Sequence, residues 1–367
     1  MAGRVTGGRR TTAQQTDEKR RAESILSDLL RSGTGRTHSC AAAGVQRGGT
    51  TLAEGFAGYT SASGRRRRVT RECLFDLASV TKMFTATIVM QSHEEGLIDL
   101  EDTAGDIVPD IESADLRRVS VFELLSHTSG LPPLRNSMKR CTSRASVLRV
   151  LNSVRVVSPG VPVYSDLGFM LLGEMVERIH GKREDELVRE RISRPLGLHS
   201  TLFNPDRKGC CAPTGYSPVR KRELVCETHN EVVARMDGVG GHAGMFSSLS
   251  ELMVFAAALL SDYTDGKHVL LKRPTLKKMV TPVSSLFGMQ YGLGFMLRSK
   301  DDRGYPSGHG PVFGHTGHTG TSVWMDAGRR LVSILLMNSD AVGGRRQEVH
   351  VMRDKFHLFA ADLADAR

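Results

Sequence analysis

Segments with the pattern of β-strands lie near both ends of this 367-residue chain, and a long helical stretch separates them. Residues 40–46 and 51–57 have the pattern of two short strands on either side of a glycine pair, which is typical of a hairpin. Residues 319–326 and 331–338 form a second such pair, whereas 97–202 is mostly helical in pattern. We therefore predict an α+β fold: an antiparallel sheet built from both chain ends and flanked by helices, with an inserted all-helical domain.

The same pattern divides the chain into regions. Residues 1–16 are basic and contain no apolar core, so we predict a disordered basic tail there. We expect one folded domain over 17–367, with its sheet-bearing part in 17–96 and 240–367 and the helical insertion in 97–239. A cleft between these two parts would hold a functional site.

Composition and charge limit the partners and the location that we expect. The formal net charge is +10, and part of it lies in Arg65–Arg68, which we interpret as a solvated basic loop. Basic residues are not interleaved with aromatics, so we predict no nucleic-acid partner. No apolar run approaches a membrane span, and residues 1–15 lack the apolar core of a secretory signal. We expect a cytoplasmic protein with a small-molecule or peptide substrate and no membrane partner. A mitochondrial location is the alternative, and the oligomeric state is not predicted.

Six cysteines occur, but none of them forms a Cys-x-x-Cys pair. Because no secretory signal is recognised, a reducing compartment and free thiols are expected. No spacing of cysteine or histidine residues supports a zinc site. The six are Cys40, Cys73, Cys141, Cys210, Cys211 and Cys226.

Ser79 and Lys82 form a Ser-x-x-Lys motif at the start of an apolar helical pattern over 80–95, which Gly96 ends. Residues three apart share one face of a helix, so the two side chains would meet. A lysine amine can take the proton of a serine hydroxyl if its surroundings lower its pKa towards neutrality. The alternative is a helix-capping serine followed by a solvated lysine, although a lysine in the first turn opposes the helix dipole.

Two later segments offer the groups that acyl transfer by a serine would also need. Tyr164 precedes an apolar helix and would relay protons, and Asp166 would hydrogen-bond the lysine. In the run 314–320, Gly317 would let a substrate approach the backbone, and the His318 N–H would stabilise an oxyanion. The alternative roles are a packing tyrosine and histidines that point to opposite faces of a strand, which makes them a poor metal pair.

Taken together, the three motifs resemble those of serine β-lactamases and penicillin-binding proteins. They are Ser79-Val-Thr-Lys82, Tyr164-Ser-Asp166 and His315-Thr316-Gly317. Tyrosine in the second motif resembles the class C branch, which includes related esterases and D-amino-acid peptidases. The resemblance runs from about Cys40 to the C-terminal helix.

The resemblance implies a role for each motif residue. Ser79 would be the acylated nucleophile, Lys82 its base and Tyr164 the proton shuttle. The backbone N–H groups of Ser79 and His318 would form the oxyanion hole beside Thr316 and Gly317, where substrate binds. No metal or organic cofactor is implied.

Two positions depart from the family pattern. Asp166 stands where the family often has asparagine, and its charge would hold Lys82 in the ammonium form. His315 stands where typical lactamases have lysine, and a mostly neutral histidine would bind a substrate carboxylate weakly. We therefore expect a serine hydrolase acting through an acyl-enzyme on ester, amide or D-amino-acid/β-lactam-type bonds, but not an efficient β-lactamase. The alternative is a catalytically dormant scaffold or oligomer-forming protein.

Overall fold

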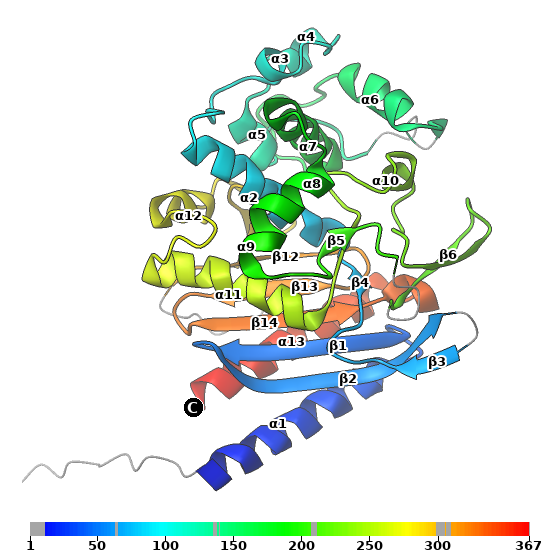
Figure 1. Cartoon of the computed structure of the whole chain (residues 1–367), viewed down its shortest axis with the longest axis vertical. Coiled ribbons are helices and arrows are strands. Elements are labelled where there is room, and N and C mark those ends of the chain that lie inside the picture. Colours follow the sequence, from blue (N-terminus) through cyan, green and yellow to red (C-terminus); the bar gives the residue numbers. More distant parts are fainter. Residues whose placement is uncertain are drawn as a thin grey trace, which may run out of the picture.

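The computed structural model describes residues 12–62, 65–134, 138, 140–206, 211–298, 305 and 310–366, and a large antiparallel sheet runs through them. Within these residues the sheet has nine strands in the order β3-β2-β1-β14-β13-β12-β11-β10-β9, with every neighbouring pair antiparallel. Strands from the two chain ends therefore share one sheet (Figure 1), and the predicted α+β fold is confirmed. The strands are β1 (Cys40–Arg47), β2 (Thr50–Ala62), β3 (Arg65–Arg68), β9 (Ser284–Leu286), β10 (Met289–Tyr291), β11 (Met296–Arg298), β12 (Val312–Thr316), β13 (Ser322–Asp326) and β14 (Leu331–Met337).

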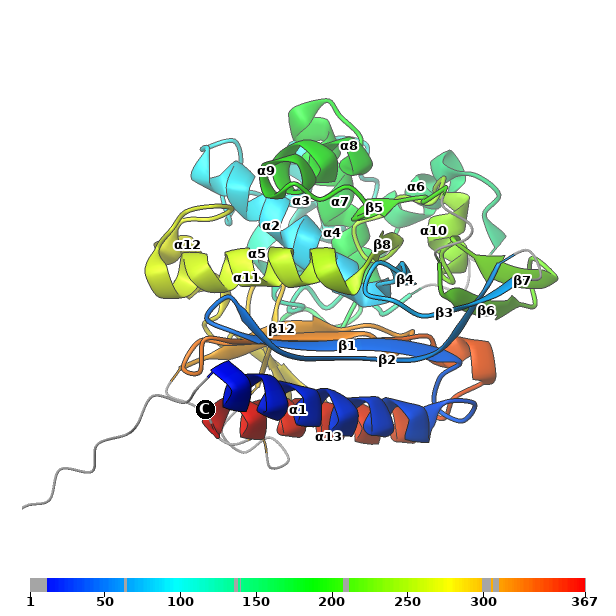
Figure 2. The ribbon, with the colours of Figure 1, turned by 60° about the horizontal axis from the view of Figure 1, so that its bottom comes forward.

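The two chain ends meet where β1 pairs with β14, with 41–47 opposite 331–337. Both strands are almost entirely buried, because helices cover both faces of the sheet. Helices α1 (Thr12–Gly33) and α13 (Arg346–Asp365) lie side by side on one face, and α11 (Leu249–Asp265) lies on the other (Figure 2). Leu26 of α1 and Phe356 of α13 are fully buried in one apolar cluster with residues of β1 and β14.

Helices make up most of the chain between the two groups of strands. The central one, α2, is buried on all sides over most of its length, which identifies it as a core helix. Phe84 of α2 stacks on Phe255 of α11 with ring centroids 4.0 Å apart. These helices are α2 (Thr81–Glu94), α3 (Ala104–Ile107), α4 (Ala114–Arg117), α5 (Val121–Leu125), α6 (Arg144–Asn152), α7 (Asp166–His180), α8 (Glu184–Val188), α9 (Arg194–Leu196), α10 (Glu231–Arg235) and α12 (Arg273–Met279).

Short strands also occur outside the main sheet, where the sequence pattern predicted helix or irregular chain. Strands β4 (Phe75–Asp76), β8 (Met245–Ser247) and β5 (Leu202–Phe203) form a small antiparallel sheet beside the start of α2. Strands β6 (Pro213–Ser217) and β7 (Arg222–Val225) form a hairpin within 204–230. Its two strands are short and one pairing is irregular, so the alternation of side chains is too brief to be recognised in the sequence.

The arginine run is a strand and not the predicted loop. Arg65–Arg68 forms β3 and pairs with β2 at the edge of the main sheet. Charged residues are common on edge strands, because they oppose pairing with another chain while their own backbone still pairs inwards. The charge of this segment therefore gave no information about its backbone conformation.

The prediction of free thiols is wrong for two cysteines. Cys211 and Cys226 form a disulfide across the β6–β7 hairpin, with their Cα atoms 5.4 Å apart. The hairpin brings the two residues together, and a spacing of 15 residues does not reveal this contact. Cys40, Cys73 and Cys141 are buried thiols that form no disulfide among the described residues, and Cys210 lies outside those residues.

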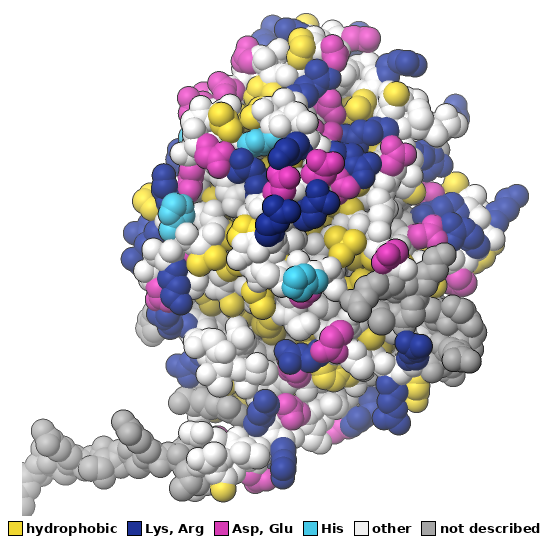
Figure 3. Space-filling model, in the orientation of Figure 1, with side chains coloured by type: hydrophobic (Ala, Val, Ile, Leu, Met, Phe, Trp, Pro, Cys, Tyr) yellow, Lys and Arg dark blue, Asp and Glu magenta, His cyan; other side chains and the backbone are white. Residues whose placement is uncertain are grey.

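The remaining predictions concern the surface charge, membrane-spanning helices and the N-terminal tail. On the face that Figure 3 shows, acidic and basic side chains are interspersed over the helical part and do not form one basic patch. No described helix is long and apolar enough to cross a membrane. Helix α1 begins at Thr12, so the last residues of the predicted tail are helical, whereas 1–11 lie outside the described residues.

Candidate active site

Ser79 lies in a tight turn that leads into α2. The turn is a short 3₁₀ segment, Ala78–Val80, and Ala78 has a left-handed backbone conformation with φ of 48°. Asp76 accepts a hydrogen bond from the Ala78 N–H at 2.9 Å, which stabilises this unfavourable conformation. The turn therefore presents the Ser79 hydroxyl at the N-terminal end of a buried helix.

The connection between β12 and β13 packs closely against this turn. Thr319 and Thr321 donate hydrogen bonds to the carbonyl oxygens of Asp76 and Leu77, at 2.8 and 3.0 Å. A Cβ atom at Gly317 would lie only 2.4 Å from the Leu77 oxygen, so this position requires glycine. The third predicted motif is thus fixed beside the serine turn.

Lys82 is fully buried, and its ammonium group donates three hydrogen bonds. Nζ lies 2.7 Å from Asp166 Oδ1, 3.1 Å from Ser79 Oγ and 3.1 Å from the carbonyl oxygen of His242. These three acceptors match the three protons of an ammonium group. Because Ser79 Oγ accepts a hydrogen bond from Lys82, its own hydroxyl proton is directed to another acceptor.

The charges of Lys82 and Asp166 depend on each other. Burial lowers the pKa of Lys82, but Asp166 and Tyr164 together outweigh burial, and the net pKa is raised. Burial raises the pKa of Asp166, but Lys82, His242 and His127 together outweigh burial and bring the pKa to about 2. At neutral pH the pair is therefore an ammonium and a carboxylate, as the aspartate in the second motif led us to expect.

Tyr164 comes from the segment before α7 and covers Lys82. Lys82 Nζ lies 5.1 Å from the centroid of the tyrosine ring. Burial raises the pKa of the phenol, whereas Lys82 and a hydrogen bond with Ser79 lower it, and the net pKa is raised. The resting site therefore holds a protonated phenol above an ammonium group.

His127 holds this tyrosine in place. Its ring packs against the Tyr164 ring with centroids 4.5 Å apart. Its carbonyl oxygen accepts a hydrogen bond from the Val163 N–H at 2.9 Å, and its Nδ1 accepts one from the Ser165 N–H at 3.2 Å. His127 was not predicted as a site residue, and the only sequence signal for it is its place in the run Ser-His-Thr-Ser-Gly at 126–130.

His315 is a buried, neutral histidine. Its Nδ1–H donates to the Thr316 carbonyl oxygen at 2.7 Å, and its ring centroid lies 6.3 Å from that of Tyr164. Burial, reinforced by the charge of Lys82, lowers the pKa of His315 to about 3. This histidine therefore supplies no positive charge to a substrate at neutral pH.

One cavity of about 810 Å³ opens over these groups. Lys82 does not line the cavity, but it donates hydrogen bonds to Ser79 and Asp166, which do. The structure therefore brings every predicted site residue to one place. Those that line the cavity are Ser79, Tyr164, Asp166, His315, Thr316, Gly317 and His318.

The same cavity is also lined by residues that were not predicted from the sequence. His229 and Asp340 lie on its wall with Arg353 of α13. Arg353 is buried and donates to the carbonyl oxygens of Gly320 and Thr321, at 3.2 and 3.0 Å, so it fixes the β12–β13 connection. These residues belong to no local pattern, and only the folded chain groups them.

Comparison with known proteins identifies the family. The Beta-lactamase family model matches residues 26–354, so the chain belongs to the Beta-lactamase family. It is 27% identical over 310 residues to the N-acetylmuramyl-L-alanine amidase of Bacillus subtilis (strain 168), with 75% of this chain and 70% of that protein covered.

Solved structures agree with this assignment at the level of the fold. A beta-lactamase from Sulfitobacter sp. EE-36 matches with a TM-score of 0.73 at 19% identity, over 98% of this chain and 100% of that one. EstCE1, a hydrolase with promiscuous acyltransferase activity, matches with a TM-score of 0.74 at 17% identity, over 95% and 98%. The predicted resemblance is confirmed, and the fold is that of the β-lactamases.

Proposed function

We propose that this chain is a serine hydrolase that forms an acyl-enzyme on Ser79 and acts on ester, amide or D-amino-acid peptide bonds. The observation that carries the proposal is the 3.1 Å contact between Ser79 Oγ and Lys82 Nζ at the wall of a large cavity. A buried cation beside a serine hydroxyl stabilises the developing alkoxide. Membership of a family whose matched relatives include an amidase supports the assignment.

In this proposal the reactive form carries one proton fewer than the resting form. Lys82 then stabilises a Tyr164 phenolate, which takes the Ser79 proton as Oγ attacks the substrate carbonyl carbon. The phenol next gives this proton to the leaving alcohol or amine. Water attacks the acyl-enzyme in the same way, passing its proton through Tyr164 back to Ser79. The Ser-x-x-Lys motif predicts a neutral Lys82 as the base. A site with neutral Lys82 and a protonated Tyr164 holds the same number of protons as one with charged Lys82 and a Tyr164 phenolate, so the two forms interconvert by moving one proton.

The developing oxyanion would be stabilised by the backbone N–H groups of Ser79 and His318. Support for this part is the tight packing of Gly317 against the Ser79 turn, which keeps the two segments together. Backbone donors fixed in this way need no reorganisation when charge develops on the substrate oxygen.

The neutral His315 argues for substrates that need no carboxylate anchor. Its lowered pKa leaves it without the permanent charge that a lysine would supply there. We therefore propose esters and amides as the main substrates and expect β-lactam hydrolysis to be inefficient. The name of the Bacillus subtilis relative supports amides as candidates.

The proposal is tested by exposing the protein to a fluorophosphonate and locating the adduct by mass spectrometry. We expect one adduct, on Ser79, and none in Ser79→Ala. A parallel screen would compare p-nitrophenyl esters, nitrocefin and D-alanyl peptides, each beside the same variant. Absence of an adduct under conditions that label a known enzyme of this family would reject the proposal and favour the dormant scaffold.

A further inference from the structure

Three side chains of the types that ligate metal ions meet on the wall of the cavity. His229 precedes α10, His318 follows β12, and Asp340 lies in the 3₁₀ turn after β14. Each offers one ligand atom, and these atoms all lie within 4.8 Å of one another. His318 Nε2 and Asp340 Oδ1 are 3.5 Å apart, which is long for a hydrogen bond. Two ligands of one tetrahedral zinc ion are about 3.4 Å apart, given zinc–ligand bonds of about 2.0–2.2 Å.

The partner of His229 leaves its other ring nitrogen available. Asp76 is buried and accepts hydrogen bonds from both the backbone N–H and Nδ1 of His229, at 2.8 and 2.9 Å. With the proton on Nδ1, the lone pair is on Nε2. A carboxylate behind a histidine is the usual support of a metal-binding imidazole, because it fixes the tautomer and strengthens the donor.

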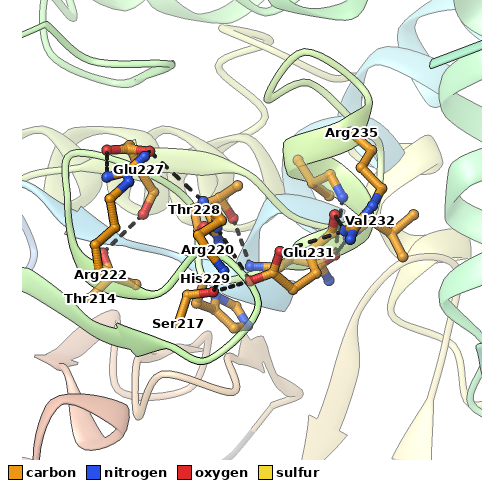
Figure 4. Close-up of polar contacts among 12 residues, drawn as sticks. Thr214, Ser217, Arg220, Arg222, Glu227, Thr228, His229, Glu231, Val232 and Arg235 are labelled. Atoms are coloured by element: carbon orange, nitrogen blue, oxygen red, sulfur yellow. Dashed lines mark hydrogen bonds and ion pairs between the residues drawn. The ribbon is translucent and has the colours of Figure 1, made fainter. Parts of the chain in front are cut away.

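The segment that carries His229 is held by the polar contacts drawn in Figure 4. On one side of it, Arg220 Nη2 donates to the carbonyl oxygen of Thr228 at 2.6 Å. On the other side, Glu231 accepts from Arg220 Nε at 3.2 Å and from Ser217 Oγ at 2.5 Å. Because these contacts anchor the chain before and after His229, its ring is fixed against Asp76 at the cavity wall.

We propose that His229, His318 and Asp340 bind one divalent transition-metal ion of the zinc type. Two imidazoles and one carboxylate are the ligand set that zinc accepts in sites with an open fourth position. The side chain of His318 is 49% exposed and that of Asp340 33%, so the ion can enter from solvent. The spacing of residues 229, 318 and 340 matches no metal motif, and the sequence therefore predicted no metal here.

The site shares its cavity with Ser79, so an ion bound there can act on the proposed reaction. Its open position would take water or an anionic group of a substrate, and it would supply the positive charge that the neutral His315 lacks. This consequence rests on the proposed hydrolase function, whereas binding of the ion does not.

The test is a titration of the untagged full-length protein with zinc and, separately, cobalt. Calorimetry and the visible spectrum of the cobalt complex would report affinity, stoichiometry and ligand type. We expect one equivalent of saturable binding, and His318→Ala and Asp340→Ala should each weaken it at least tenfold. Both side chains are partly exposed, and circular dichroism would show that the variants are folded.

Two control variants make the outcome specific. His268 lies 3.6 Å from Glu94 outside the cavity, so His268→Ala removes a comparable histidine–carboxylate pair and should leave the affinity unchanged. Ser79→Ala should also bind the ion normally, so that loss of the hydrolase function and loss of the metal site are distinguished. The proposal is overturned if the wild type shows no saturable binding, or if His318→Ala and Asp340→Ala retain the wild-type affinity.

Discussion

Lys82 Nζ lies 2.7 Å from Asp166 Oδ1, and this ion pair joins the first turn of α2 to the start of α7. The pair keeps Lys82 charged and occupies one of its three donors. A charged Lys82 cannot accept the Ser79 proton itself. The pair therefore governs the pH at which the proposed site becomes reactive.

Asp166→Asn should shift the rising limb of the pH–rate profile to lower pH. The Asp166 carboxylate raises the pKa of Lys82, so its removal lowers that pKa and populates the deprotonated reactive form at lower pH. An opposite charge at this distance shifts a pKa by about 1–3 units, so we expect a shift of at least about one pH unit. The measurement is kcat/KM of a neutral ester against pH. Asp166→Glu, which keeps the charge, is the control; equal profiles for all three proteins would contradict the prediction.

Tyr164→Phe should abolish most activity without unfolding the protein. The variant keeps the ring that packs on His127 but loses the proton-transferring oxygen. Loss of a general acid–base group costs about 10²–10⁴-fold in rate. Tyr291→Phe is the matched control. The ring centroid of Tyr291 lies 6.1 Å from that of Tyr164, and this variant also loses one phenol oxygen. A comparable loss of kcat in both variants would argue against a specific role for Tyr164.

Glu184→Gln should stabilise the protein increasingly as pH rises. Thr85 Oγ1 lies 2.6 Å from Glu184 Oε1 and 2.8 Å from the carbonyl oxygen of Gly241, but its single proton can serve only one of them. A protonated Glu184 that donates to Thr85 satisfies both contacts, and burial raises the pKa of this carboxyl to about 8.

The sign of the pH dependence follows from this raised pKa. The contribution of Glu184 to stability is fully present below its unfolded pKa of about 4.3 and is lost as pH rises towards 8. At about 1.4 kcal/mol per pH unit, the loss amounts to about 5 kcal/mol. Denaturant unfolding of wild type and Glu184→Gln at pH 5 and pH 8 should show a gap that widens with pH. Glu186→Gln alters an exposed carboxyl on the same helix and should show no such widening.

Breaking the disulfide between Cys211 and Cys226 should lower stability by about 3 kcal/mol, the value expected for a closed loop of about 15 residues. Denaturant unfolding with and without a reducing agent measures this difference. The Cys211→Ala/Cys226→Ala double variant should resemble the reduced wild type and no longer respond to the reductant. If the reducing agent lowered the stability of both proteins equally, the loss of stability would come from other cysteines.

Local sequence patterns predicted the fold class and the residues of the three motifs. Strand and hairpin patterns at both chain ends were enough to predict the shared antiparallel sheet, because these signals depend on neighbouring residues. Ser79, Lys82 and Tyr164 were recognisable because the three motifs together resemble those of a known family, whereas each motif alone also fits a structural role. The β6–β7 hairpin was missed because its strands are too short to show a period.

The sequence by itself determined which chemical groups are present and in what order, because helix starts and turns are local features. Only the tertiary structure decided that Lys82 is buried within 2.7 Å of Asp166, that His127 supports Tyr164, and that His229, His318 and Asp340 meet. The reason is physical: pKa values and ligand sets depend on burial and on distances between segments far apart in the chain. Neither quantity exists until the chain has folded.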